Sequence, residues 1–112
     1  MTRQEVIVAI RNGEFLAGKD LRGLDLSRLN LSRACFAKAN LSEANLHGVN
    51  LTEANLSGAD LSGANLKGAC LEFADLSFAD FSWTTNWDGA STPGADFSGS
   101  ILWPGSKRGE SK

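Results

Sequence analysis

The chain has 112 residues, of which 42 % are hydrophobic, and a formal net charge of −2. This length suits a single domain. Its longest apolar run, from Val6 to Ile10, is far shorter than the roughly 20 residues that a membrane helix requires, and the pattern of a secretory signal peptide is missing. We therefore expect a bacterial-type cytoplasmic protein that does not enter a membrane.

The charges are unevenly distributed along the chain. Residues 1–38 carry seven basic and four acidic side chains, whereas residues 39–104 carry one basic and eight acidic side chains. The sequence thus combines a basic N-terminal part with an acidic body, an asymmetry that bears on the choice of partner.

Residues 2–12 are predicted to form one short helix. Thr2 and Glu5 form the Thr-x-x-Glu pattern of a capping box, and Val6 and Ile10 follow at helical spacing. The Asn-Gly pair at residues 12 and 13 supplies a stop signal. We assign residues 1–13 to a capping helix that lays its apolar side chains over the next element.

Residues 14–83 divide without a gap into 14 units of five residues, whose middle residue we call the centre. Every centre is Leu or Phe. Ala stands two residues before the centre in nine units, and Asp or Asn stands directly before it in 11 units. The centres are Leu16, Leu21, Leu26, Leu31, Phe36, Leu41, Leu46, Leu51, Leu56, Leu61, Leu66, Leu71, Leu76 and Phe81.

A period of five matches neither an amphipathic helix nor an alternating strand. It does match a solenoid with a square coil, in which each unit forms one side and four units, or 20 residues, complete a turn. We expect the centre and the residue two before it to point inward. The other three positions should point outward, and hydrogen bonds should join successive coils along the axis.

The units resemble the pentapeptide-repeat family, whose pattern is A(D/N)LXX. The segments Ala39-Asn40-Leu41-Ser42-Glu43 and Ala59-Asp60-Leu61-Ser62-Gly63 match that pattern fully. The resemblance covers most of the chain and implies an all-β, right-handed quadrilateral parallel β-helix behind the short capping helix. It implies no particular function, because members of that family share architecture more than activity.

The C-terminal region continues the repeat in a degraded form. If Thr84 is counted as a one-residue insertion, the period resumes, with centres at Trp87, Thr92, Phe97 and Leu102. We assign residues 14–83 to the regular solenoid, 84–104 to a degraded final coil and C-terminal cap, and 105–112 to a polar tail. Pro93 and Pro104 suit a last edge, because proline cannot donate a ladder hydrogen bond.

No catalytic, cofactor-binding or metal site is expected. His47 is the single histidine and stands at an outward position. Cys35 and Cys70 fall on different walls of a 20-residue coil, so that a disulfide between them is not expected. The sequence has no phosphate-binding loop, no zinc-ligand spacing and no nucleophile beside a base. We expect a protein that is not an enzyme.

The acidic side chains of the C-terminal half form one candidate partner-binding surface. The resemblance allows a functional interpretation, because some pentapeptide-repeat proteins mimic duplex DNA and bind gyrase-like enzymes. The alternative is that the repeat accepts Asp wherever it accepts Asn. The residues concerned are Asp60, Asp75, Asp80, Asp88 and Asp96.

A second candidate partner-binding surface is aromatic. Phe73, Phe78 and Trp83 occupy the same outward position in three successive units. Large apolar groups that lie so close together either anchor a partner or are covered by the chain itself. Residues 84–94 and Trp103 are the segments that could fold back over them.

The sequence predicts a scaffold or adaptor that binds an unknown protein partner through its walls or its C-terminal end. One alternative is a DNA-mimicking modulator of a type II topoisomerase, and another is a purely structural solenoid that associates with itself. We expect no direct binding to nucleic acid. We also expect a monomer in preference to a homodimer joined at the C-terminal ends.

Overall fold

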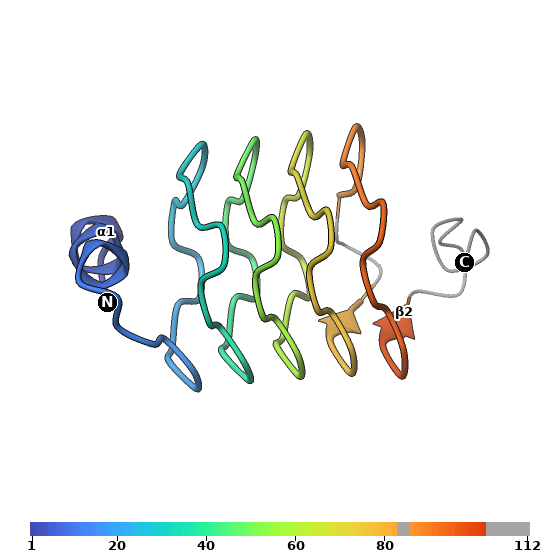
Figure 1. The fold of residues 1–112 in the computed structure, drawn as a ribbon, viewed down its shortest axis with the longest axis horizontal. Coiled ribbons are helices and arrows are strands. Elements are labelled where there is room, and N and C mark those ends of the chain that lie inside the picture. The colour runs from blue at the N-terminus through green and yellow to red at the C-terminus, as the bar shows by residue number, and fades with distance from the viewer. Residues whose placement is uncertain (83–85, 103–112) are drawn as a thin grey trace.

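The computed structural model describes residues 1–82 and 86–102. It contains the helix α1 (Arg3–Arg11) and the strands β1 (Asp80–Phe81) and β2 (Ile101–Leu102). Between α1 and β2 the chain winds into coils that stack side by side, with α1 at the N-terminal end of the stack (Figure 1).

Parallel bridges join each coil to the next. Bridged residues are 20 apart in the sequence up to the pair Asp60 and Asp80, and 21 apart from the pair Asn65 and Asn86 onward. This change of spacing confirms that one extra residue enters the repeat between Asp80 and Asn86. Thr84, to which we assigned the insertion, lies outside the described residues.

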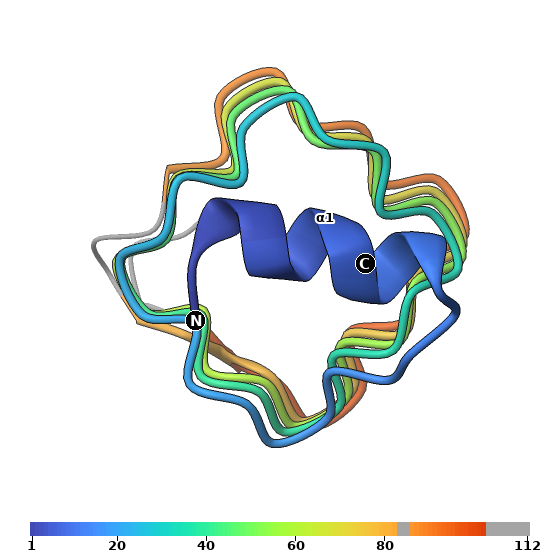
Figure 2. The same ribbon diagram turned by 90° about the vertical axis from the view of Figure 1, so that its left-hand side faces the viewer.

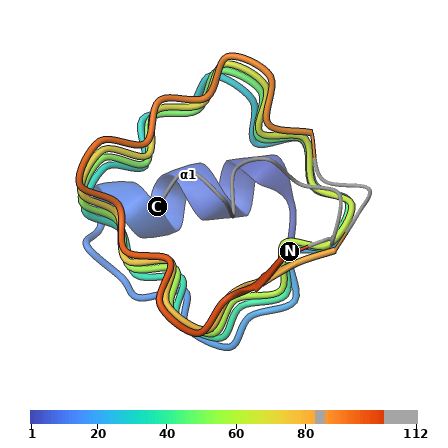
Figure 3. The same ribbon diagram turned by 90° about the vertical axis from the view of Figure 1, so that its right-hand side faces the viewer.

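The bridges arrange the residues that precede the centres in four columns, which we call walls 1 to 4 in chain order. Successive coils superpose in views from either end of the stack (Figure 2 and Figure 3), so that each wall is nearly flat. Wall 1 contains Cys35, Asn55, Asp75 and Asp96; wall 2 contains Asp20, Asn40, Asp60 and Asp80; wall 3 contains Asp25, Asn45, Asn65 and Asn86; wall 4 contains Asn30, Asn50, Cys70 and Ser91.

The core is the column of centres inside the coils. All 14 predicted centres are buried, and the nine alanines are buried too, except for the partly buried Ala34. Glu14 and Lys19 occupy the same position as these alanines in the first coil, yet they are exposed. Burial at this position therefore does not extend to the N-terminal edge, where burying an unpaired charge would be costly.

Among the described residues, three aromatic rings close the C-terminal end of the core. The ring of Trp87 lies 4.6 Å from that of Phe81 and 5.8 Å from that of Phe97, measured between centroids. Trp87 is partly buried and Phe97 is buried, as expected of centres. The degraded coil thus continues the core beyond the insertion.

Tight turns separate the sides of each coil. In a representative turn, the amide of Ala44 donates to the carbonyl of Leu41 at 3.1 Å, and the third residue, Glu43, has φ +59°. This left-handed conformation recurs two residues after successive centres, which explains why glycine is frequent there. Among the described residues, seven other than glycine also adopt it: Arg28, Arg33, Lys38, Glu43, Glu53, Phe73 and Phe78.

The extended segments are shorter than an all-β description suggests. Among the described residues, β1 and β2 are the only strands, each two residues long, and they pair in parallel with Asp80 beside Ile101. The remaining contacts between coils are isolated bridges. Because a turn interrupts the chain every five residues, the inter-coil hydrogen bonds, such as those from the amides of Leu41 and Glu43 to the carbonyls of Asp60 and Ser62, do not build longer strands.

The predicted N-terminal helix is present as α1 and lies across the opening of the first coil (Figure 2). Both hydrogen bonds of the capping box between Thr2 and Glu5 are formed, and Val6 and Ala9 are buried against the core. This packing closes one end of the stack, where coils of another molecule could otherwise add.

Arg3 satisfies backbone carbonyls at the edge of the first coil. Its guanidinium donates to the carbonyl of Asp25 at 2.9 Å and to that of Ser27 at 3.2 Å. One coil later, the amides of Leu26 and Arg28 donate to the carbonyls at the equivalent positions. The Arg3 side chain thus replaces the two amides that a preceding coil would supply.

Candidate functional site

The acidic candidates lie on three walls. Asp60 and Asp80 are bridged neighbours on wall 2, and Asp75 and Asp96 are bridged neighbours on wall 1. Asp88 follows the centre of a unit on wall 3, and its carbonyl accepts the amide of Gly68. The structure therefore brings four of the five carboxylates together in two stacked pairs on adjoining walls and leaves Asp88 apart.

Three of these carboxylates hold the turns that follow them. Oδ1 of Asp60 accepts hydrogen bonds from the amide and the hydroxyl of Ser62, at 3.0 and 2.6 Å. Asp75 and Asp96 bind Ser77 and Ser98 in the same way. Asn side chains of other units bind the amide two residues on through the same atom. This shared role supports the interpretation that Asp substitutes for Asn in the repeat.

Asp80 differs from the other three acidic candidates that precede a centre. Within the described residues its carboxylate makes no such turn hydrogen bond, and it stacks on Asp60 of the preceding coil. Burial raises the pKa of Asp80, and the negative charge of Asp60 raises it further. The ionised form of Asp80 is therefore less favourable here than in water.

Phe73 and Phe78, which we call the aromatic pair, occupy the two corners that border wall 1, on either side of Asp75. Their side chains are 64 % and 70 % exposed, and their φ angles are +59° and +61°. The Phe73 amide donates to the Pro93 carbonyl and the Phe78 amide to the Ser98 carbonyl. These backbone hydrogen bonds fix both corners on the final coil.

Each ring of the aromatic pair rests on a glycine of the final coil. A Cβ atom added at Gly94 would overlap the ring of Phe73, and one added at Gly99 would overlap the ring of Phe78. The described part of the final coil thus contacts one side of each ring and leaves most of it exposed. Trp83, residues 84 and 85, and Trp103 lie outside the described residues.

Two cations occupy the equivalent corners two coils nearer the N-terminus, on either side of Cys35. We call Arg33 and Lys38 the cationic pair; both are exposed, and Nε of Arg33 lies 2.8 Å from Oε1 of Glu53. This pair was not among the residues predicted from the sequence. A signal was available, because the cations and the aromatic rings share one position of the repeat and are 40 residues apart.

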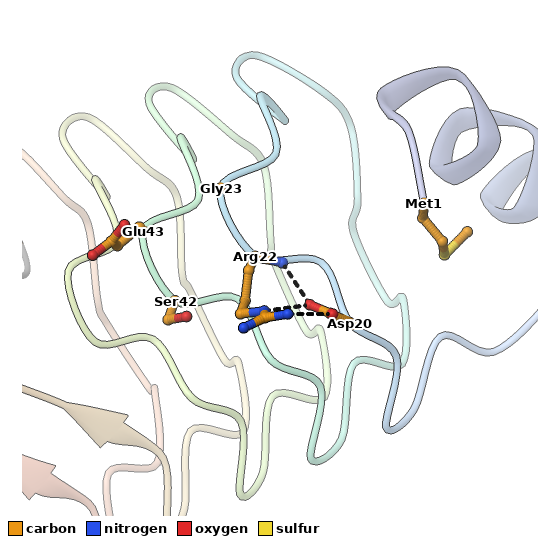
Figure 4. Close-up of a pocket in the computed structure, with 6 residues that line it drawn as sticks. All are labelled: Met1, Asp20, Arg22, Gly23, Ser42 and Glu43. Atoms are coloured by element: carbon orange, nitrogen blue, oxygen red, sulfur yellow. Dashed lines mark hydrogen bonds and ion pairs between the residues drawn. The ribbon is translucent and has the colours of Figure 1, made fainter.

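Two hollows lie at the N-terminal end of the stack. The larger, on wall 2, is open and polar and has a volume of about 600 Å³; Asp20 and Arg22 form an ion pair of 2.9 Å within it (Figure 4). The hydrogen bond from Arg22 lowers the pKa of Asp20. The smaller hollow, about 130 Å³, lies where wall 1 meets the end of α1, and Gly13, Phe15, Arg33 and Cys35 are among its lining residues.

Features of other functional classes are missing from the described part of the chain. It contains no group of three or more His, Cys, Asp or Glu side chains that could hold a metal ion, and no helix there is long and apolar enough to cross a membrane. Cys35 and Cys70 are free thiols on walls 1 and 4, as expected. The exposed aromatic pair and the stacked carboxylates are thus the prominent surface features.

Comparisons with known proteins agree with this architecture. The family model for pentapeptide repeats matches residues 15–42 and 44–82 in eight copies. The chain therefore belongs to the pentapeptide-repeat family, whose members are generally structural or binding proteins. No curated protein matches it.

Two solved structures of pentapeptide-repeat proteins are similar to this chain. Rfr23 from the cyanobacterium Cyanothece 51142 is 36 % identical with a TM-score of 0.72; the match covers 74 % of this chain and 56 % of Rfr23. The protein alr5209 from Nostoc Pcc 7120 is 30 % identical with a TM-score of 0.64; that match covers 90 % of this chain and 95 % of alr5209. The chain thus spans little more than half the length of the first and nearly all of the second.

Proposed function

We propose that this protein is a non-enzymatic scaffold that binds another protein through wall 1, near its C-terminal end. The binding surface consists of the aromatic pair, with Asp75 between the two rings and Asp96 in the next coil. A partner that fits it offers apolar groups for the two rings and a positive charge for the carboxylates between them.

The conformation and exposure of the aromatic pair carry this proposal. A bulky side chain at positive φ costs free energy, of the order of 1 kcal/mol or more, and glycine would occupy the same corner without that cost. The other described residues at positive φ that are not glycine are charged, so that their exposure costs little. Phe73 and Phe78 are strained and also expose an apolar surface, a combination that stability alone does not favour.

The architecture supports a scaffold role. We infer a right-handed quadrilateral parallel β-helix from the four bridged walls and from the clockwise sense in which the chain recedes in Figure 2. Its flat walls present rows of side chains at about 4.8 Å spacing. Because Leu, Phe and Ala side chains fill the buried interior, we place binding on the outer walls. We also propose the cytoplasm as the compartment of the protein.

Photo-crosslinking in cells tests the binding surface. A photoreactive amino acid at Ser77 lies on wall 1 between the aromatic rings, and one at Lys67 lies at the equivalent position on the opposite wall 3. We expect Ser77 to give a discrete crosslinked protein that Lys67 does not, and the double substitution Phe73→Gly, Phe78→Gly to abolish it. Identical products from both positions, or products insensitive to that substitution, would contradict the proposal.

The stacked carboxylates also give some support to the DNA-mimic function. Asp60 with Asp80, and Asp75 with Asp96, form two acidic columns on adjoining walls. If these columns replace phosphates, the protein should inhibit a type II topoisomerase, and Asp60→Asn with Asp80→Asn should weaken inhibition. Added salt should weaken it too, because exposed charges are screened over about 10 Å at 0.1 M. A large excess of protein without inhibition would exclude this function.

A further inference from the structure

The cationic pair and the aromatic pair are placed symmetrically on wall 1. The wall has Asn55 near its middle. The cationic pair lies one coil to the N-terminal side of Asn55, and the aromatic pair lies one coil to its C-terminal side, at the same two corners. A surface that has a cation and a ring at equal distances on opposite sides of one point is self-complementary, because a twofold rotation places the cation of one copy opposite the ring of the other.

We infer that wall 1 binds a second copy of this chain in an antiparallel dimer whose twofold axis passes Asn55. This inference rests on the proposed binding surface and names its occupant. The axis lies in the plane of contact and runs perpendicular to the direction in which the coils stack. Rotation about it reverses the stacking direction but leaves each corner of wall 1 on the same side of the wall. Lys38 therefore faces Phe78 of the second copy, and Arg33 faces Phe73 of the second copy.

The facing groups attract each other. A Lys or Arg cation over an aromatic face is a favourable electrostatic contact, and the symmetry produces four such contacts per dimer. Between them, Asp75 faces Cys35 of the second copy, so that the carboxylate comes to lie between two cations. The basic N-terminal part of one copy thus covers the acidic, aromatic part of the other.

The smaller hollow has the right place to receive a ring. Phe73 leans toward Gly94, in the next coil along the chain. Because the two stacks run in opposite directions, this ring points toward the N-terminal end of the second copy. It therefore points to the gap between Arg33 and Gly13 of the second copy. There the hollow of about 130 Å³ opens, with Phe15 in its wall. A projecting ring on one copy then meets a depression on the other.

Charge distinguishes wall 1 from its neighbour. The same operation on wall 2 would place Asp60 opposite Asp60 of the second copy, two like charges at the axis. On wall 1 the neutral Asn55 takes that place. Glu53 also lies near the axis at one corner, but the Arg33 guanidinium pairs with it at 2.8 Å within each copy. The contact therefore brings no unpaired like charges together.

The area of wall 1 limits the expected affinity of the dimer. A wall of about five coils at about 4.8 Å each, on a molecule 23 Å wide, offers roughly 500 Å² per copy. The sum over both copies is near the lower end for specific complexes. We expect a reversible dimer that dissociates on dilution.

Sedimentation equilibrium with paired charge variants tests the dimer. We expect a concentration-dependent rise from 11.9 kDa toward twice that mass. Lys38→Glu should weaken the dimer about 5- to 30-fold, because it removes two cation–aromatic pairs, and Phe78→Lys should weaken it at least as much. A mixture of the two variants should recover dimers. In the mixed dimer the new carboxylate at position 38 meets the new ammonium group at position 78, while the unchanged Lys38 still meets an unchanged Phe78.

Arg28→Glu is the matched control. Arg28 is exposed, has φ +63° and leans over Gly48 as Lys38 leans over Gly58, but it stands at the corner between walls 3 and 4. It should leave the dimer unchanged. A wild type that stays monomeric at its highest soluble concentration would overturn the inference. So would a dimer that both Lys38→Glu and Phe78→Lys leave intact, or a mixture that fails to recover dimers.

Crosslinking tests the position of the axis. The test uses a chain with Cys35→Ser and Cys70→Ser, so that Asn55→Cys supplies its single cysteine. A bis-maleimide that spans about 10 Å, the spacing of facing sheets, should join this cysteine to the same residue of a second copy. Asn65→Cys, at the same level on wall 3, should give little product. Equal or greater crosslinking at position 65 would exclude the wall 1 contact.

The two proposals fail in different ways. A monomeric wild type whose Ser77 probe still captures another protein removes the dimer and leaves the scaffold function. A Ser77 product with twice the chain mass, sensitive to Lys38→Glu, supports the dimer. A wild-type dimer with no dependence on Phe73 or Phe78, together with Ser77 products that the Phe73→Gly, Phe78→Gly substitution leaves unchanged, contradicts both.

Discussion

At the residue scale, the corner position two residues after each centre has the greatest influence on the surface. Its left-handed backbone favours glycine, yet the chain places cations, carboxylates and two phenylalanines there. The sequence predicted that these residues point outward. It did not predict their backbone strain or the glycine beneath each ring, because both depend on how one coil seats on the next.

Gly94→Ala tests the seat of Phe73. Alanine at position 94 would have φ +72°, and its methyl group would overlap the ring of Phe73. Alanine at position 89 would have nearly the same φ, +73°, but its methyl group would meet only atoms of Gly68, at 3.7 Å or more. We expect Gly89→Ala to lower the free energy of unfolding by about 1 kcal/mol through strain, and Gly94→Ala to lower it by about 1 kcal/mol more through displacement of the ring. Urea denaturation measures both. Equal losses would contradict the contact between Phe73 and Gly94.

Asp80→Asn should stabilise the protein at neutral pH. The pKa of Asp80 is raised above its ordinary value by burial and by Asp60, so that the folded chain binds this proton more tightly than the unfolded chain does. The resulting penalty is present above the folded pKa and disappears as the pH falls below the unfolded value. We expect a gain of a few tenths of a kcal/mol at pH 7, the scale of a screened like-charge pair.

The matched control is Asp88→Asn, which removes the same charge from wall 3, away from Asp60. Thermal unfolding of both variants should be followed at pH 7 and again at about pH 3, below the ordinary carboxyl range. We expect the gain from Asp80→Asn to vanish at the lower pH. A gain that persists there, or that Asp88→Asn reproduces, would show that repulsion from Asp60 is not its source.

At the scale of elements, α1 shows both the reach and the limit of sequence reasoning. The capping box of Thr2 and Glu5 predicted the start of the helix, because its signal lies within four residues. The role of Arg3 could not be predicted in this way. Its partners are carbonyls of Asp25 and Ser27, which become its neighbours only when α1 docks on the first coil.

Arg3→Met should weaken the N-terminal edge. It leaves two carbonyls of the first coil without their protein donor, and we expect a loss of about 1 kcal/mol in the free energy of unfolding. Arg11→Met removes the same charge from the last turn of α1 and should cost only a few tenths of a kcal/mol. Urea denaturation would compare them. If both variants lose the same amount, the two carbonyl contacts contribute nothing.

At the scale of the whole molecule, the period of five determines the architecture. It predicted the four-sided coil, the buried centres and the shifted register after β1, because each repeats 14 times or is forced by the stacking. It did not predict how far the final coil covers Phe73 and Phe78, because that depends on how one coil seats on the next. The shared wall of the cationic and aromatic pairs does follow from the period, because the two pairs hold the same position of the repeat 40 residues apart.

Leu61→Asp tests the stacked core. Leu61 is a fully buried centre in the middle of the stack, and an unpaired carboxylate there has no compensating partner among the apolar side chains. We expect loss of several kcal/mol, enough to unfold a domain of this size, seen as a collapse of the native circular dichroism spectrum. Lys67→Asp on the outer wall 3 should remain folded. A Leu61→Asp variant with the wild-type melting temperature would contradict the stacked core.

The most direct test of the central claim is the melting temperature of the Phe73→Gly, Phe78→Gly double variant, measured together with its binding. Glycine relieves strain of about 1 kcal/mol at each corner, which offsets the missing packing of the rings on Gly94 and Gly99. In dilute solution, where self-association adds no stability, we predict a melting temperature within about 5 °C of the wild type. Crosslinking from Ser77 should disappear in the same variant. A fall well beyond that range with unchanged crosslinking would show that the two rings serve stability and that wall 1 is not a binding surface.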